Sequence, residues 1–426
     1  MQKLAINGGT PIRTTPFPRY NTIGDEEKRA VMEVLDSGVL SQFLGTWHPD
    51  FYGGTTVRNL EKEWAEYFGV KHAVTVNSAT SGLYAAVGAA GVGPGDEVIV
   101  SPYTMAASAT AALVYGGIPV FADIDPDIFC LSPASIRERI TPYTRAIIVV
   151  DICGHPADMD EIMAIATELN LVVIEDNAQG PGAMYNGKFA GTLAHMGVFS
   201  LNYHKTIHTG EGGVVVTDDD DLAERLQLIR NHAEAVVRGK GVENLVNMVG
   251  FNYRMTEIEA AIGREQLKKL KVLVEKRQQA AAYLTERLKV LPGITPPMVR
   301  NGATHGFYIY PIRYDARITE VSRERYAEAL KAEGLTVGAG YVRPLYLEPL
   351  YQKRTAFGKD GFPFTYPGYK GKVSYEKGIC PVTERMYFDE LIFADVCHAN
   401  MTKNDLVDVA AIFEKINLYM EELRLM

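Results

Sequence analysis

Lys205 is the residue of this chain whose type and surroundings best suit covalent chemistry. It lies five residues after Ser200 and is followed by the glycine-rich turn Thr209–Gly213. A tight polar turn can fix an amine near a bound carbonyl and lower its pKa, so the stretch Ser200–Gly213 predicts an amine that reacts covalently. A solvated surface lysine beside a flexible turn is the alternative.

A pair of adjacent acids follows an apolar run upstream of that lysine. Val172–Ile174 is typical of a buried strand, Glu175 and Asp176 come at its carboxyl end, and Gln179 lies three residues further on. Parallel α/β sheets bind ligands at this end of their strands, where a carboxylate can hold the proton on a heterocyclic nitrogen. Because neighbouring side chains alternate, only one of the two acids need face the ligand. A metal-binding or capping aspartate is the alternative.

The turn Asn77–Gly82 joins a predicted strand to the N-terminus of a helix. Backbone N–H groups and hydroxyls at such a place form an anion site suited to one phosphate. Plain N-capping by Ser78 or Thr80 is the alternative. A phosphate turn, an acid for a pyridine nitrogen and a lysine for a carbonyl are the three elements that pyridoxal phosphate requires of a protein. Their occurrence along one stretch of chain predicts that cofactor.

The elements that must position these residues alternate between short apolar strands and amphipathic helices. This pattern predicts an α/β fold with a mostly parallel sheet, preceded by an N-terminal arm. A long helix from about Thr256 to Leu291 leads into a smaller α+β region, so we expect a large domain over 1–269 and a small one over 270–426. A strand at Pro311–Arg313 and helices at Arg323–Glu333 and Asn404–Leu423 belong to the latter. The strands expected in the large domain are 72–76, 97–100, 119–122, 146–151, 171–175, 197–200 and 213–216.

Composition limits the partners of the chain. With 426 residues, a net charge of −9 and a pI near 5.6, it lacks the basic character that nucleic acid or an anionic membrane surface requires. No apolar run approaches a membrane span, and the N-terminus does not resemble a signal peptide. The four cysteines are widely spaced, which favours reduced thiols and a cytoplasmic location.

No metal site is expected. His204 and His208 lie near the lysine, but their spacing is not that of metal ligands, and a structural or substrate-contact role is favoured. The acidic run Asp218–Asp221 is most simply the first turn of a helix, where negative charge meets the positive end of the helix dipole. Metal binding by that run is the alternative.

Six stretches resemble the DegT/StrS-type aminotransferases, which are pyridoxal phosphate enzymes of fold type I that aminate keto sugars and keto cyclitols. They are spread over nearly the whole chain, and together they are highly specific. The stretches are Leu4–Pro11, Gly93–Val100, Gly154–Asp160, Ile174–Gln179, Lys205 with Thr209–Gly213, and Asn252–Glu257.

The resemblance implies a role for each matching residue. Lys205 matches the lysine that holds the cofactor as an internal aldimine, and Asp176 matches the acid on its pyridine nitrogen. Gln179 matches the side chain beside the phenolic oxygen of the ring. Asn252 matches an asparagine that reaches the phosphate of the neighbouring subunit, which implies a homodimer with shared sites. The phosphate-binding positions match Ala79, Thr80 and Ser200.

Two positions of this family pattern leave alternatives open. Where the family stacks an aromatic ring on the cofactor, this chain has Met105, whose polarizable sulfur can pack on a ring face, and Tyr103 could serve instead. Arg254, in the same motif as Asn252, could contact a ligand or form an ion pair at the subunit interface.

The resemblance implies transfer of an amino group from glutamate or glutamine to a keto sugar or keto cyclitol. A pyridoxamine-dependent sugar dehydratase, which carries histidine where this chain has Lys205, is the first alternative, and a non-catalytic regulator on the same fold is the second. A nucleotide-dependent oxidoreductase would need a glycine fingerprint that the chain lacks. The stretches Gly8–Pro11 and Tyr341–Tyr351 resemble family members that act on cyclitols or related antibiotic precursors more than those that act on nucleotide sugars. Arg343, Tyr346 and His398 could face it or could pack in a dimer.

Overall fold

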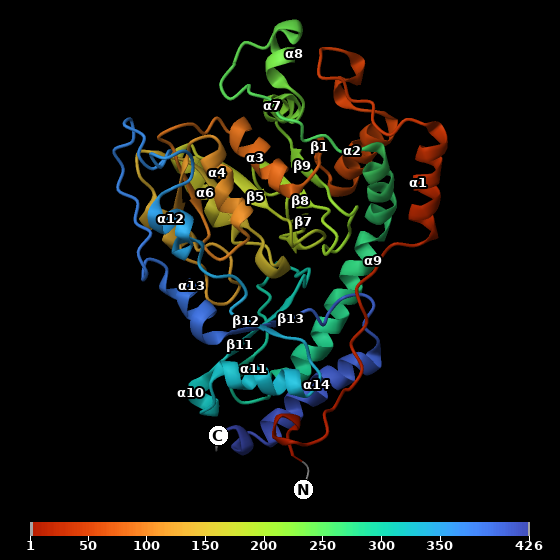
Figure 1. Cartoon of the computed structure of the whole chain (residues 1–426), viewed down its shortest axis with the longest axis vertical. Helices are drawn as coiled ribbons and strands as arrows, with labels where there is room; N and C mark the ends of the chain where they lie inside the picture. Colours follow the sequence, from red (N-terminus) through yellow and green to blue (C-terminus); the bar gives the residue numbers. More distant parts are fainter. Residues whose placement is uncertain (1–2, 425–426) are drawn as a thin grey trace.

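The computed structural model describes residues 3–424 and shows a layered α/β protein with a second, smaller sheet below the main one (Figure 1). Its main sheet has the strand order β1-β9-β8-β5-β4-β2-β3. Only β9 runs against its neighbours, so the sheet is mostly parallel, as predicted. The strands are β1 (His72–Val76), β2 (Glu97–Val100), β3 (Ile118–Phe121), β4 (Thr144–Val150), β5 (Val172–Asp176), β8 (Met196–Ser200) and β9 (Gly213–Thr217).

Both faces of this sheet are buried, which explains why its strands are apolar at almost every position. Val98 and Ile148 point to one face, where they pack with residues of α3, α4 and α7, while Ile99 and Ile147 point to the other, toward α5 and α6. This alternation follows from the two-residue period of a strand. The surrounding helices are α2 (Thr55–Phe68), α3 (Ala79–Ala89), α4 (Ala106–Val114), α5 (Pro133–Arg139), α6 (Met159–Leu169), α7 (Asp220–Arg230) and α8 (Ala233–Lys240).

The acidic run Asp218–Asp221 does begin a helix. Asp219 is the N-cap of α7 and accepts a hydrogen bond from the backbone N–H of Leu222 at 2.9 Å. Within residues 3–424, no group of acidic, histidine and cysteine side chains is arranged to hold a metal ion. The interpretation of this run as the first turn of a helix is therefore confirmed.

The smaller sheet is antiparallel throughout and has the order β10-β11-β13-β12. It packs with the second half of α9 and with α11 and α14. Its elements are β10 (Ile294–Thr295), β11 (Tyr310–Tyr314), β12 (Gly338–Ala339), β13 (Leu391–Ala394), α10 (Ala316–Thr319), α11 (Arg323–Ala332) and α14 (Lys403–Leu418). Three short helices complete the region, α12 (Pro349–Lys353), α13 (Pro381–Arg385) and α15 (Glu421–Arg424), and a small hairpin of β6 (Met184–Tyr185) and β7 (Lys188–Phe189) lies in the large part.

The C-terminal helix α14 ends before the predicted end at Leu423. The chain leaves the helix at Tyr419, where φ is −109° and ψ is 29°, and a separate short helix follows. Met420 and Leu423 still pack into the core beneath the small sheet together with Ile416, as their spacing on one helix face predicts.

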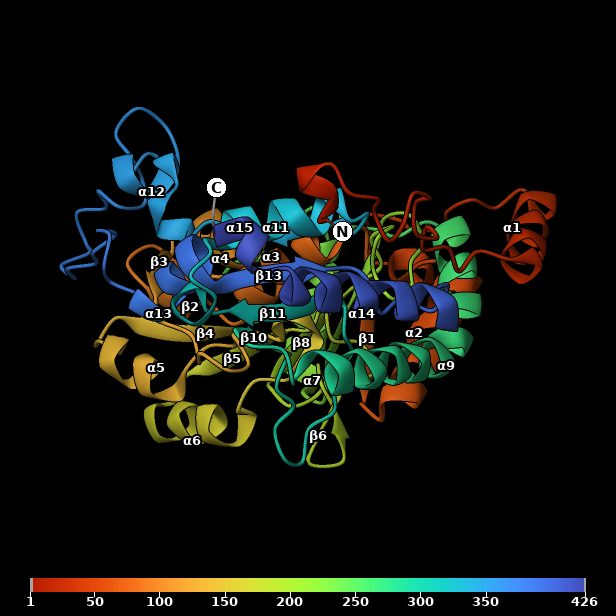
Figure 2. The ribbon, with the colours of Figure 1, turned by 90° about the horizontal axis from the view of Figure 1, so that it is seen from below.

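One long helix, α9 (Glu257–Leu288), runs from the main sheet to the small one (Figures 1 and 2). Thr256 and Glu259 cap its start reciprocally, so the helix begins where the sequence predicts. The division of the chain at residue 269 or 270 stays a prediction, and its outermost residues, 1–2 and 425–426, lie outside the described range. The hydrophobic cores cross that division in both directions, since Leu4 packs under the small sheet and Tyr351 and Tyr375 pack on the main core.

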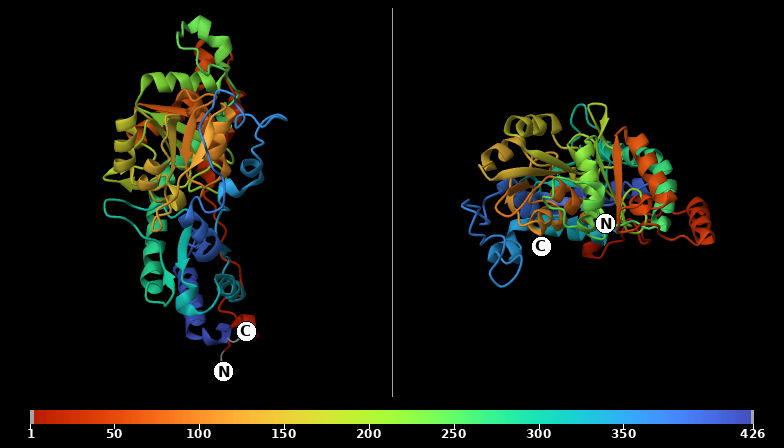
Figure 3. Two further views of the ribbon diagram at one scale, coloured as in Figure 1. Left: turned by 90° about the vertical axis from the view of Figure 1, so that its left-hand side faces the viewer. Right: turned by 90° about the horizontal axis from the view of Figure 1, so that it is seen from above.

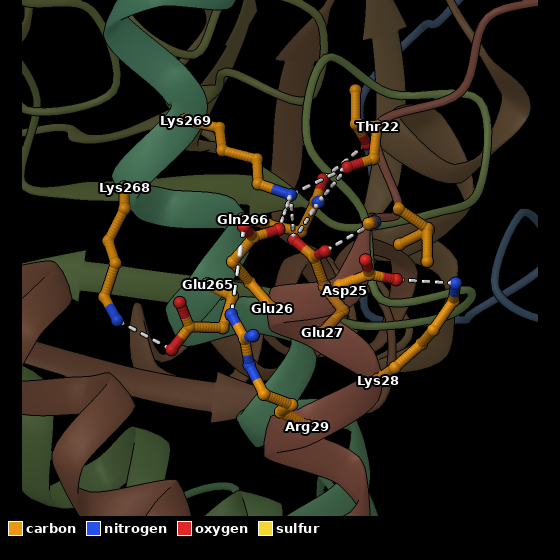
Figure 4. Close-up of polar contacts among 12 residues, drawn as sticks. Thr22, Asp25, Glu26, Glu27, Lys28, Arg29, Glu265, Gln266, Lys268 and Lys269 are labelled. Carbon is orange, nitrogen blue, oxygen red and sulfur yellow. Dashed lines mark hydrogen bonds and ion pairs between the residues drawn. The ribbon is translucent and has the colours of Figure 1, made fainter.

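The N-terminal arm runs the length of the molecule and ends in α1 (Asp25–Ser37), which lies on the first half of α9. Gln266 of α9, fully buried, donates hydrogen bonds to the carbonyl oxygen of Thr22 and to Oε1 of Glu27 (Figure 4). Lys269 pairs with the same Glu27 carboxylate at 2.6 Å. Both ends of the described chain lie beside the small sheet (Figure 3), where Glu422 accepts a hydrogen bond from the backbone N–H of Leu4. These hydrogen bonds and the ion pair therefore hold the arm against α9 and the C-terminal region.

Candidate active site

The ends of several strands meet at one edge of the main sheet. Asp176 ends β5, Ser200 ends the adjacent strand β8, and Gly213 begins the antiparallel strand β9 at the same edge. A Cβ atom on Gly213 would lie 2.7 Å from the backbone nitrogen of Ala79, so only glycine allows the start of α3 to approach this closely. The three sequence features thus converge, as expected for the ligand edge of an α/β sheet.

Lys205 lies in a closed turn directly after β8. The turn is fixed by backbone hydrogen bonds of 2.9 Å from Lys205 to Asn202, from Thr209 to Leu201 and from Leu201 to Gly212. The lysine is buried, with 9% of its surface exposed. Burial lowers its pKa to about 8, and the negative charge of Asp176 opposes that shift only partly. The structure therefore places an amine that loses its proton readily, which a nucleophile requires.

Asp176 is buried and is held by hydrogen bonds on both oxygens. Ser108 of α4 donates its hydroxyl to Oδ2 at 2.7 Å, and the backbone N–H of Ala178 donates to Oδ1 at 3.2 Å. Burial raises the pKa of this carboxyl, while Ser108, Ala178 and the charge of Lys205 all lower it. These contacts favour the ionised form in a dry site, which can hold a proton on a ring nitrogen.

The neighbouring acid faces elsewhere. Glu175 accepts hydrogen bonds from the backbone N–H groups of Gly191 and Leu193 at 2.7 and 2.9 Å, so its side chain anchors the loop before β8. The expectation that the two acids point to opposite sides follows from strand geometry, and the structure shows it.

The N-terminus of α3 begins with Ala79 and Thr80. Ser78 caps it by accepting a hydrogen bond from the backbone N–H of Ser81 at 3.0 Å, so the capping alternative describes Ser78 correctly. The first N–H groups of a helix still have no acceptor inside the helix, and they could bind one phosphate. Ser200 is buried nearby at the end of β8. Capping and anion binding are therefore compatible here.

Gln179 joins this site to the small sheet region. Its Oε1 accepts a hydrogen bond from the backbone N–H of Cys153 at 2.8 Å, and its Nε2 donates to the hydroxyl of Tyr341 at 2.9 Å. Tyr341 has a φ of 59°, a left-handed conformation that is costly for a bulky side chain and that is found mostly at functional sites. The amide is thus held firmly next to Asp176.

Met105 and Tyr103 lie in very different surroundings. Met105 is 66% exposed at the start of α4, whereas Tyr103 is 1% exposed and donates its hydroxyl to the carbonyl oxygen of Gly340 at 2.9 Å. Tyr103 therefore packs inside the protein, and the geometry favours Met105 as the side chain that can lie on a ring.

The remaining candidate residues differ in their exposure and in their contacts. Asn252 is exposed, and its carbonyl oxygen accepts a hydrogen bond from Asn77, while Arg254 donates to Asn231 at 3.1 Å. Arg343 is exposed near Glu348. Tyr346 is buried and donates its hydroxyl to Glu384. His398 is buried beside the ring of Tyr20. His204 and His208 flank Lys205 in the turn. The buried Tyr346 packs in the main core and does not line an open substrate site.

Two contacts of the site were not predicted from the sequence. They are the hydroxyl of Ser108 on Asp176 and the ring of Tyr308, whose centroid lies 4.5 Å from Nζ of Lys205. Ser108 follows a strand of the predicted ligand edge, which is the signal that could have found it. Tyr308 comes from the small sheet region about a hundred residues later, and no local pattern indicates it.

The residues present fit pyridoxal phosphate. A lysine with a lowered pKa, a buried acid held by two hydrogen bonds and a helix N-terminus lie at the same edge, and these match its carbonyl, its pyridine nitrogen and its phosphate. Such a site defines an enzyme that works through a cofactor held by a lysine.

Comparison with known proteins assigns the family. Residues 21–375 match the DegT/DnrJ/EryC1/StrS aminotransferase family, to which the chain belongs. The L-glutamine:2-deoxy-scyllo-inosose aminotransferase of Streptomyces lividus is 34% identical over 97% of both chains. The GDP-perosamine synthase of Caulobacter vibrioides is 37% identical over 76% of this chain and 84% of its own. The crystal structure of DesI with its TDP-sugar product has a TM-score of 0.81 and 29% identity, covering 99% of this chain and 97% of that one.

The protein is accordingly a pyridoxal phosphate-dependent aminotransferase of fold type I. None of the helices described here is both long and apolar enough to cross a membrane.

The pKa of Lys205 can be tested through cofactor capture. Only the neutral amine attacks a carbonyl, so the rate at which cofactor-free protein binds pyridoxal phosphate should rise with pH and level off above about 8. An ordinary lysine would keep the rate rising to about pH 10.4. Absorbance of the bound cofactor, followed from pH 6 to about 11, measures the midpoint. Asp176→Asn should move the midpoint to lower pH, and a midpoint near that of free lysine would contradict the assignment.

The contact between Ser108 and Asp176 gives a second prediction. Ser108→Ala removes a hydrogen bond that favours the ionised carboxylate, so the ring nitrogen should be less protonated and kcat should fall about tenfold. The ¹⁵N resonance of labelled pyridoxal phosphate in the holoenzyme reports that protonation directly. Ser108→Thr keeps the hydroxyl, and Thr110→Ala changes the same helix away from the acid, so both should retain the parent resonance. An unchanged resonance in Ser108→Ala would argue against the contact.

Proposed function

We propose that this aminotransferase moves an amino group from glutamate or glutamine to a keto sugar or keto cyclitol. The observation that supports this most is the buried Lys205 amine, which interacts electrostatically with the buried Asp176 at the ligand edge of the sheet. When bound, pyridoxal phosphate supplies the carbonyl that receives the donor nitrogen and the ring that accepts electrons. The protein supplies the amine, the acid and the phosphate contacts.

Each site residue has a role in this proposal. Lys205 binds the cofactor covalently and, once freed by the amino donor, moves a proton between the donor carbon and the cofactor carbon. Asp176 holds the proton on the pyridine nitrogen, and Gln179 lies beside the phenolic oxygen. Met105 packs on the ring face. The phosphate contacts come from Ala79, Thr80 and Ser200, with Asn252 contributed by the neighbouring subunit.

The sequence relatives support one class of amino-group acceptor. The inosose aminotransferase matches this chain over 97% of both lengths, whereas the perosamine synthase matches over 76% of this chain. Between these two sequence relatives the fuller match is to the cyclitol enzyme, which supports a keto cyclitol as acceptor and L-glutamine as donor. A dehydratase would have histidine in place of Lys205. A regulator without activity would not need an amine whose pKa is lowered to about 8.

A homodimer in the cytoplasm is part of the proposal. Asn252 is exposed at the rim of the site, where a second subunit could receive it. Apolar side chains on and after α1 are also exposed, as expected for a surface that another copy covers; they are Met32, Leu35, Val39, Leu40 and Leu44. All four cysteines are unpaired, which suits a reducing compartment.

The amino-transfer assignment is tested by the half-reactions. Purified holoenzyme mixed with L-glutamine should convert the cofactor to its amine form, seen by absorbance, and addition of 2-deoxy-scyllo-inosose should restore the carbonyl form. Lys205→Ala should stop turnover by a factor of at least about a thousand, because the covalent anchor and the proton carrier are lost together. Restoration by a nucleotide-linked keto sugar alone would redirect the acceptor. No half-reaction with either amino acid would reject the donor assignment.

Shared sites are tested by mixing two inactive variants, Lys205→Ala and Asn252→Asp. If Asn252 completes the neighbouring site, a hybrid dimer has one intact site, and mixing should restore about a quarter of the parent activity, because about half of the dimers are hybrids. If each chain uses its own Asn252, no hybrid site is intact. Activity that stays at the level of the separate variants would therefore contradict the shared-site arrangement.

A further inference from the structure

Tyr308 covers the reactive amine. Its ring centroid lies 4.5 Å from Nζ of Lys205, within the range in which an aromatic face attracts an ammonium group. The residue precedes β11 of the small sheet and packs against the core cluster of the main sheet that contains Ile99 and Ile147. Its position does not depend on the lysine turn, because its backbone N–H donates to the carbonyl oxygen of Cys153 at 2.9 Å.

A buried arginine holds Tyr308 in place. Arg277 of α9 is 1% exposed and donates through Nη1 to the carbonyl oxygens of Phe307 and Tyr308, at 2.9 and 3.4 Å. Its guanidinium also lies 4.8 Å from the ring centroid of Tyr20 in the arm. The hydroxyl of Tyr20 in turn donates to the carbonyl oxygen of Thr206, next to Lys205, at 2.5 Å. Arg277 therefore positions the Tyr308 ring above the Lys205 amine and, through Tyr20, the backbone of Thr206 beside it.

The charged groups near Nζ of Lys205 show what the ring of Tyr308 can contribute. Asp176 is the carboxylate whose charge favours the ammonium form of Lys205, and its own charge must also serve the ring nitrogen of the cofactor. His204 lies in the same turn, near Tyr308, and its pKa is lowered by burial and by the charge of Lys205. Arg277 and Asp395 lie behind Tyr308 and pair with each other at 3.8 Å. The negative face of the Tyr308 ring is thus a second stabilising group for a positive charge on Nζ.

We propose that Tyr308 is a further catalytic residue, whose ring face receives the Lys205 ammonium each time the lysine carries a proton. In that step the lone pair of the Lys205 nitrogen takes the proton of the donor carbon. An N–H bond forms, the C–H bond breaks, and the electron pair stays on the carbon. The ring stabilises the charged lysine without a hydrogen bond, so the proton can be passed on. This inference rests on the proposed amino-transfer function.

A fluorine series tests the ring separately from its shape. Tyr308→Phe serves as the reference, and mono-, di- and trifluorophenylalanine at position 308 weaken the negative ring face stepwise with little change in size. The midpoint pH of pyridoxal phosphate capture by the full-length protein reports the pKa of Lys205. We expect that pKa to fall step by step, by about one over the series, because the ammonium form loses stabilisation. The kcat of the half-reaction with L-glutamine should fall in the same order.

Tyr310 is the matched control. It is buried two residues away, and its hydroxyl is bonded to Thr285 at 2.8 Å, away from the lysine. The same series at position 310 should leave the capture midpoint unchanged. A midpoint that does not change with fluorination at 308 would overturn the proposal. Capture does not depend on donor or acceptor, so a trend in the midpoint without any amino transfer would reject the proposed function and leave the interaction between the ring and the amine in place.

Discussion

Burial of an amine beside a carboxylate is the constraint on which the structure depends. Removing Lys205 from water lowers its pKa to about 8, and the same burial raises the pKa of Asp176. The shift of Lys205 favours the neutral amine that covalent binding needs, whereas the shift of Asp176 works against the ionised form that holds a proton on a ring nitrogen. The hydroxyl of Ser108 and the backbone N–H of Ala178 oppose that upward shift by bonding to the carboxylate. The strand ends, the start of α4 and the turn after β8 can be understood as the scaffold that maintains this balance.

Much of this scaffold could be predicted from the sequence. Each strand predicted for the main sheet occurs within two residues of its expected position, because parallel strands buried on both faces are apolar throughout and are bounded by turns. Lys205, Asp176 and the start of α3 could be brought together without coordinates because the carboxyl ends of such strands share one edge. The convergence of these three features therefore follows from the topology of the parallel sheet.

Other parts depend on contacts that leave no local signal. The break at Tyr419 leaves no mark in the apolar pattern, because Ile416, Met420 and Leu423 keep the spacing of one helix face across it. Tyr308 and Tyr341 reach the site from the small sheet, about a hundred residues or more from Lys205 along the chain. Their positions are set by a buried arginine on α9 and by a left-handed backbone, neither of which can be read from spacing. The opposite surroundings of Met105 and Tyr103 likewise appear only in three dimensions.

The path of the chain between the two cores limits how the enzyme can move. The chain passes between them along the arm, again along α9, again before Leu345 and finally after Cys380. A hinge needs few connections, because every crossing segment must bend at the same place. Here the arm, a continuous helix and two further segments all cross, so rotation of one core against the other would break hydrogen bonds at Gln179 and Arg277. A bulky acceptor would therefore have to enter from the exposed surface around Met105 and Asn252, without a movement of one core against the other.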